Sequence, residues 1–162
     1  MGAEMTEKQT ENNIDVLAGL IKSCRAAQSG FLSAAERTRN SDLGAYFTGR
    51  SMERARFAAE LERAARQLSE AELSLNAPIA ESVQRAWVDF NLARGTSDSG
   101  ILSIVAEAER TTREFYRQAL SLKFPSEVAA LLERQADSVS DAYDQICTLR
   151  DMRGKAAWPP AA

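Results

Sequence analysis

Apolar residues recur every three or four positions along four long stretches of this chain. Because an α-helix completes a turn in about 3.6 residues, this spacing places them on one helix face. The pattern predicts helices at residues 12–39, 41–69, 98–123 and 125–152. The residues that define the four apolar faces are Ile14, Leu17, Ile21, Cys24, Phe31, Leu43, Phe47, Phe57, Leu61, Leu68, Ile101, Val105, Phe115, Leu122, Val128, Leu132, Val139 and Ile146.

Two of the three connections between these helices are very short, so each forms an antiparallel hairpin. The middle connection is long and contains a predicted short helix at residues 77–94, which Pro78 opens and Gly95 closes. A segment of that size allows the chain to return along the length of a bundle. The sequence therefore predicts an all-α, ferritin-like four-helix bundle with a long crossover. The alternative is an up-down bundle or a five-helix array with the short helix across one end.

The chain is long enough for one domain with a substantial core, which we place at residues 12–152. Residues 1–11 are predicted to be a disordered N-terminal tail and residues 153–162 a flexible C-terminal tail, because neither stretch shows the helical periodicity.

The composition narrows the range of partners. The net charge of −3 provides no general attraction to nucleic acid or to anionic lipid. No apolar run approaches the roughly 20 residues of a membrane span, and the first residues are too polar for a signal peptide. We expect a cytoplasmic protein with neither nucleic acid nor membrane as a partner.

Four segments, taken in order and spacing, resemble one known group of proteins. They are residues 30–36 (GFLSAAE), 54–61 (RARFAAEL), 132–135 (LERQ) and 149–151 (LRD). The chain is similar, from residue 14 to residue 151, to bacterial ferritin-like four-helix-bundle proteins catalogued as a domain of unknown function. The resemblance implies a ferritin-like fold and a bacterial cytoplasmic location, and no established activity. Tyr143 stands where such proteins often carry a histidine near the end of the last helix.

A metal site between helices is the chemistry that bundles of this kind most often carry. It usually takes a Glu from each of two helices and a Glu-x-x-His pair from each of the others, but this chain has no histidine. The carboxylates that would have to serve alone are Glu36, Glu53, Glu107, Glu109 and Asp137. Arg56 follows Glu53 by three residues, on the same helix face, and its charge would repel a metal ion. We therefore predict no metal and no other cofactor.

The two cysteines, Cys24 and Cys147, are expected to be reduced core residues. Along the predicted helices they are separated by about 15 Å, which is too far for a disulfide. The absence of histidine also excludes general-base catalysis by imidazole.

One group of polar residues falls on the core-facing side of the predicted bundle. The first hairpin sets Gln28 beside Arg54, and the crossover brings Glu109 to the same level. An arginine in the core is costly without a partner, so we predict a buried polar layer of Gln28, Arg54 and Glu109. The alternative stays open: Arg50 and Arg54 extend from the edge of the core to water.

These observations favour a non-catalytic bundle that associates with itself or with another protein. The alternative is a metal-binding or oxidoreductase protein that uses carboxylates alone. A carrier of small ligands in the bundle interior is disfavoured, because the core-facing residues are large enough to fill it.

Overall fold

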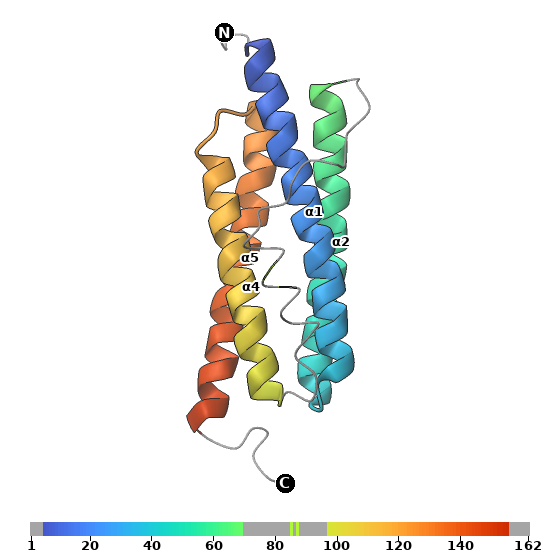
Figure 1. Ribbon diagram of the computed structural model, residues 1–162, viewed down its shortest axis with the longest axis vertical. Helices are drawn as coiled ribbons and strands as arrows, with labels where there is room; N and C mark the ends of the chain where they lie inside the picture. Colours follow the sequence, from blue (N-terminus) through green and yellow to red (C-terminus); the bar gives the residue numbers. More distant parts are fainter. Residues whose placement is uncertain (1–4, 70–84, 86, 88–96, 156–162) are drawn as a thin grey trace.

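The computed structural model describes residues 5–69, 85, 87 and 97–155 of the chain. These residues form four long helices: α1 (Glu7–Arg37), α2 (Ser41–Leu68), α4 (Asp98–Leu120) and α5 (Ser126–Lys155) (Figure 1). The described residues contain no strand. The predicted all-α four-helix bundle is confirmed.

The first helix begins at Glu7 and not at residue 12, so residues 7–11 are helical instead of part of a disordered tail. A capping box fixes this start. The Gln9 amide donates to Thr6 Oγ1 at 3.2 Å, and the Thr6 amide donates to Gln9 Oε1 at 3.0 Å. Apolar periodicity locates only the core-facing part of a helix, and here the cap extends the helix beyond it.

The remaining helix ends follow local capping as well. Asn40 and Ser97 cap α2 and α4 by accepting from the amides of Leu43 and Gly100. The third long helix ends at Leu120, before the predicted residue 123, and the last helix continues to Lys155, beyond the predicted residue 152.

Asp98, the first residue of α4, fixes the direction of that helix. Its carboxylate accepts from the amides of Arg39 and Asn40, at 2.9 and 3.0 Å, in the turn between α1 and α2. At the other end of the bundle, Asn13 of α1 donates to the carbonyl of Lys123, in the turn between α4 and α5. Since α2 starts where α4 starts, the two helices run in the same direction, and α2 ends at the opposite end of the bundle (Figure 1).

The predicted crossover helix at residues 77–94 lies outside the described residues, apart from Arg85 and Trp87. Trp87 is buried and its ring meets the Phe31 ring edge-on, with the centroids 5.5 Å apart. The Trp87 ring also covers Gly30, where a Cβ atom would lie 2.0 Å from Trp87 Cε3. Only a glycine allows so close an approach between this ring and the α1 backbone.

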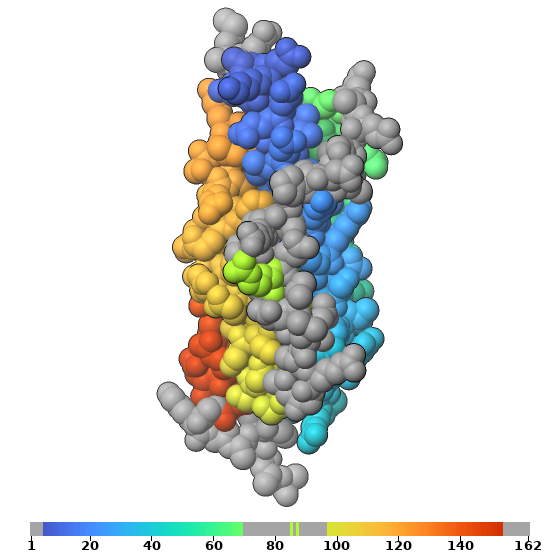
Figure 2. All heavy atoms as spheres, in the orientation of Figure 1, coloured from blue at the N-terminus to red at the C-terminus, as the bar shows by residue number. Residues whose placement is uncertain are grey.

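Two apolar clusters fill the core, one toward each end of the bundle. α1 packs against α2 and α4 against α5, and α1 also contacts α4 along the face shown in Figure 2. The first cluster includes Leu17, Ile21, Leu61, Ala119, Leu132 and Val139. The second includes Phe31, Leu43, Phe47, Ile101, Val105 and Ile146. Within the described part of the chain, no helix combines the length and the apolar character that crossing a membrane requires.

Candidate functional site: a polar network in the core

Arg54 of α2 and Glu109 of α4 form an ion pair inside the bundle. Arg54 Nη1 donates to Glu109 Oε1 at 2.8 Å and Arg54 Nη2 donates to Glu109 Oε2 at 2.5 Å. The exposed fraction of each residue is 0%. Two parallel hydrogen bonds of this kind are the strongest geometry available to an arginine and a carboxylate. Because α2 belongs to the first hairpin and α4 to the second, the pair links the two halves of the bundle.

Aromatic rings surround the guanidinium where it is not bonded to Glu109. Arg54 Cζ lies 5.4 Å from the Phe31 ring centroid and 5.8 Å from that of Phe57. Phe31 belongs to one apolar cluster and Phe57 to the other, so the ion pair lies where the clusters meet. Arg54 Nε is buried and makes no hydrogen bond, and Glu53 Oε1 lies 4.0 Å from it.

The charge on Arg54 is maintained by its partner. Burial alone would lower the pKa of this guanidinium, but the charge of Glu109 and its hydrogen bonds outweigh burial, and the pKa is raised. Arg54 is therefore cationic under all ordinary conditions. The two opposite charges cancel, and the interior holds a neutral pair in place of a free cation or anion.

A second chain of polar groups lies beside the ion pair. The Tyr116 hydroxyl of α4 donates to Gln135 Oε1 of α5 at 2.8 Å, and lies 3.3 Å from Cys24 Sγ of α1. Gln135 Nε2 donates in turn to the carbonyl oxygen of Phe57 at 3.3 Å. All four helices thus contribute to one group of buried residues, Cys24, Arg54, Glu109, Tyr116 and Gln135, which we call the polar network.

The Cys24 thiol and the Tyr116 hydroxyl both keep their protons at neutral pH. Burial raises the pKa of the Cys24 thiol to about 11, although the hydrogen bond with Tyr116 and the charge of Arg54 lower it. Burial also raises the pKa of the Tyr116 hydroxyl well above its ordinary value. Cys24 is therefore an inert, protonated thiol and not a nucleophile.

Alkaline pH is expected to destabilise the protein through these groups. In the unfolded chain the Cys24 thiol ionises near pH 9, whereas the folded protein retains the proton until about pH 11. This group's contribution to the free energy of unfolding is therefore fully present below pH 9. It falls by about 2 to 3 kcal/mol as the pH rises toward 11. Urea unfolding across this range measures it. In Cys24→Ala the decline should be shallower, with Tyr116 supplying the rest, and an unchanged slope would contradict the assignment.

The structure brings two of the three residues of the predicted polar layer together. Gln28 is half-buried. Its backbone carbonyl oxygen accepts a hydrogen bond from Ser51 Oγ at 2.8 Å. Its side chain does not bond to Arg54 or Glu109. Arg50, the other arginine considered, is partly exposed and pairs with Glu53. Arg50 thus follows the alternative prediction for arginines in this helix, whereas Arg54 is buried.

The five candidate metal carboxylates do not converge. Glu109 is bonded to Arg54, Glu107 to the exposed Arg110, and Glu53 to Arg50, while Glu36 and Asp137 are exposed. Among the described residues, no three carboxylate or thiol groups gather as a metal would require. The donor set does not fit the metal pair of ferritin-like bundles, since the buried Glu109 is already neutralised by a cation.

Both cysteines are free. Cys24 lies in one apolar cluster and Cys147 packs against the other. The two thiols have separate partners, Tyr116 for Cys24 and Tyr143 for Cys147.

Comparison with known families assigns most of this chain to one of them. The sequence pattern of the family described as "Domain of unknown function (DUF2383)" matches residues 12–122. The chain belongs to the DUF2383 family. Comparison with curated protein sequences finds none that matches.

The DUF2383 match covers three of the four helices that build the polar network. Arg54, Glu109, Cys24 and Tyr116 lie inside the matched residues, whereas Gln135 of α5 lies beyond them. The family description names no activity.

Three members of the network were not predicted from the sequence as a group. Gln135 and Cys24 both occupy core-facing positions of the helical pattern, and this position was the signal that could have indicated their burial. Tyr116 was not predicted to be buried, because the apolar pattern assigned its neighbour Phe115 to the core. In the structure Tyr116 is fully buried and Phe115 only partly so. The hydroxyl of Tyr116 reaches Gln135, and this bond favours the rotation of α4 that buries the tyrosine.

Proposed function

We propose that this protein is a non-catalytic, ferritin-like bundle that acts by associating with protein, either a second copy of itself or another chain. The observation that carries the proposal is the ion pair between Arg54 and Glu109. In a bundle that performs metal chemistry, buried carboxylates are the ligands. Among the described residues, the buried carboxylate is that of Glu109, which is paired with a cation of the same chain, so the outer surface is what remains for function.

The filled interior supports the same conclusion. Large side chains of both apolar clusters are fully buried on either side of the ion pair. The thiol and hydroxyl beside the pair are bonded to each other and held in their protonated forms.

The ferritin-like part of the proposal is supported by the common direction of α2 and α4, which a long crossover requires. The bacterial and cytoplasmic parts rest on the family resemblance of the sequence, and the short crossover helix rests on its apolar pattern.

Iron binding tests the non-catalytic part of the proposal. Untagged protein, mixed with ferrous iron without oxygen and then desalted, is expected to retain far less than two irons per chain. The reason is that Arg54 would have to leave Glu109 before a metal ion could bind there. Elemental analysis measures the retained iron. Two irons per chain, with an oxo-bridged absorption band after exposure to air, would overturn the proposal.

A further inference from the structure

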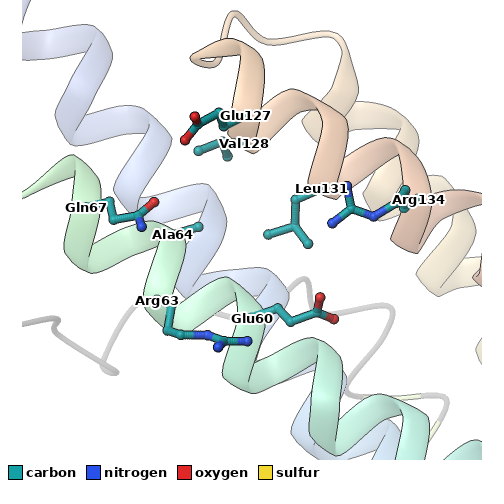
Figure 3. Close-up of a pocket in the computed structure, with 8 residues that line it drawn as sticks. All are labelled: Glu60, Arg63, Ala64, Gln67, Glu127, Val128, Leu131 and Arg134. Carbon is teal, nitrogen blue, oxygen red and sulfur yellow. The ribbon is translucent and has the colours of Figure 1, made fainter.

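An open groove of about 280 Å³ runs between α2 and α5 on the surface of the bundle (Figure 3). Its floor is apolar and its two rims are polar. The residues that line it are Glu60, Arg63, Ala64 and Gln67 from α2, and Glu127, Val128, Leu131 and Arg134 from α5. The lining carries two positive and two negative side chains, so the groove as a whole is neutral.

On each rim, a negatively charged residue is followed along the helix by a positively charged one. Glu60 is followed by Arg63 one turn later on α2, and Glu127 is followed by Arg134 two turns later on α5. Glu60 is half-buried, whereas the other three are exposed. Among the described residues no ion pair joins the two rims, and Glu60 pairs with Arg56 of its own helix, at 4.0 Å. Each rim therefore offers one charge of each sign to an occupant.

The two sign changes lie at the same height of the bundle. Phe57 of α2 is level with Gln135 of α5, since the Gln135 side chain donates to the Phe57 carbonyl. The midpoint of the α2 pair is four and a half residues after Phe57, and the midpoint of the α5 pair is four and a half residues before Gln135. α2 and α5 run in opposite directions, so both steps lead toward the same end. The hydrogen bond from Tyr46 to Gln145 fixes the same alignment lower in the bundle.

We propose that this groove is a docking surface for a second copy of the chain, related by a two-fold axis that crosses α2 and α5 at this height. Such an axis places each helix antiparallel to its own copy. Glu60 then faces Arg63 of the second copy, and Glu127 faces Arg134 of the second copy, each pair occurring twice. The inference rests on the proposed function and names the partner and the surface.

The alternative axis, parallel to the helices, would set α2 of one copy against α5 of the other. Because Phe57 is level with Gln135, Glu60 would then lie about two residues, or roughly 3 Å, from the height of Arg134, and Arg63 equally far from the height of Glu127. The perpendicular axis brings each pair of opposite charges to the same height, so it matches the charges more closely. The double substitution described below separates the two axes, because about the parallel axis it would set like charges opposite one another.

Sedimentation velocity of the full chain over a range of concentrations tests the proposal. The unaltered protein should show a reversible dimer. Glu127→Arg and Arg134→Glu should each weaken dimerisation at least tenfold, because each sets like charges opposite one another on α5. Glu133→Arg is the matched control: this exposed α5 residue does not line the groove, and its substitution should leave the dimer unchanged.

Recombining the substitutions gives the decisive result. The double substitution Glu127→Arg with Arg134→Glu only reverses the charge order of α5 and should restore the dimer. An equimolar mixture of the two single-substitution chains should form a heterodimer, because each substituted α5 then carries two groove charges of one sign, which face two charges of the other sign on its partner. Circular dichroism checks that each chain is folded.

The outcomes separate this inference from the function on which it rests. A chain that stays monomeric at every concentration, or a dimer that neither single substitution weakens, would refute the docking surface. The proposed function would survive that result if cross-linking in the native cell joined the chain to another protein. Retention of two irons per chain would instead refute the proposed function, whatever the oligomeric state.

Discussion

Glu109→Gln should lower the free energy of unfolding by about 3 to 5 kcal/mol, the largest single-residue effect that we expect. The substitution keeps the size of the side chain and removes its charge, so the Arg54 guanidinium is left buried without a counter-charge. The two phenyl rings near Arg54 cannot replace a bidentate carboxylate. Urea unfolding followed by circular dichroism measures the loss.

Glu107→Gln provides a matched control on the same helix. Glu107 also pairs with an arginine, Arg110, but both side chains are about half exposed. Ion pairs at the surface contribute little, so this substitution should cost under about 1 kcal/mol. Equal losses for the two glutamates would mean that Arg54 reaches water and that the pair is not buried.

Gly30→Ala is expected to destabilise the protein by about 1 to 3 kcal/mol, although alanine is normally the better helix former. The added Cβ would lie 2.0 Å from Cε3 of the Trp87 ring, so the ring has to leave its place against α1 and Phe31. In a Trp158→Phe background Trp87 is the sole tryptophan. Its emission should move to longer wavelength as the ring becomes exposed, in parallel with the lower stability.

Gly49→Ala separates this clash from the general effect of alanine in a helix. Gly49 lies within α2, and a Cβ atom there would meet nothing within 4 Å. This substitution should stabilise the protein by about 0.5 to 1 kcal/mol through helix propensity. If Gly30→Ala stabilised the protein as well, with unchanged Trp87 emission, the contact between Trp87 and α1 would be refuted.

The helices could be predicted because their core-facing residues repeat with the helical period. Their ends could not be placed from that signal alone. The capping box at Thr6 extends α1 through polar residues that carry no periodicity, and Ser121 terminates α4 before Leu122, an apolar residue that continues the pattern. Local hydrogen bonds, and not burial, decide these positions.

The ion pair was accessible to sequence reasoning because an arginine at a core-facing position needs a partner, and hairpin geometry limits where that partner lies. The contribution of Gln28 was not predictable in the same way. The rotation of α1 about its own axis decides whether its side chain or its carbonyl meets α2, and the carbonyl meets Ser51. The bond between Tyr116 and Gln135 likewise depends on which of two adjacent aromatic residues α4 turns inward.

The buried ion pair also suggests how this sequence selects a single arrangement of its two hairpins. A bidentate pair between α2 and α4 is formed only when the helices are aligned at one height. Apolar contacts tolerate sliding far better, because they have no preferred direction. The pair thus specifies the register of the bundle even where its net contribution to stability is small.

The coupling energy between Arg54 and Glu109 tests the central claim most directly. It is obtained from the unfolding free energies of four proteins: the unaltered chain, Arg54→Met, Glu109→Leu and the double variant. Each single substitution leaves one buried charge unpaired, whereas the double variant leaves none. We predict a coupling energy of about 3 kcal/mol, with the double variant regaining most of the stability lost in either single variant. A coupling energy indistinguishable from zero, with two small and additive losses, would contradict the buried pair and the account of function that rests on it.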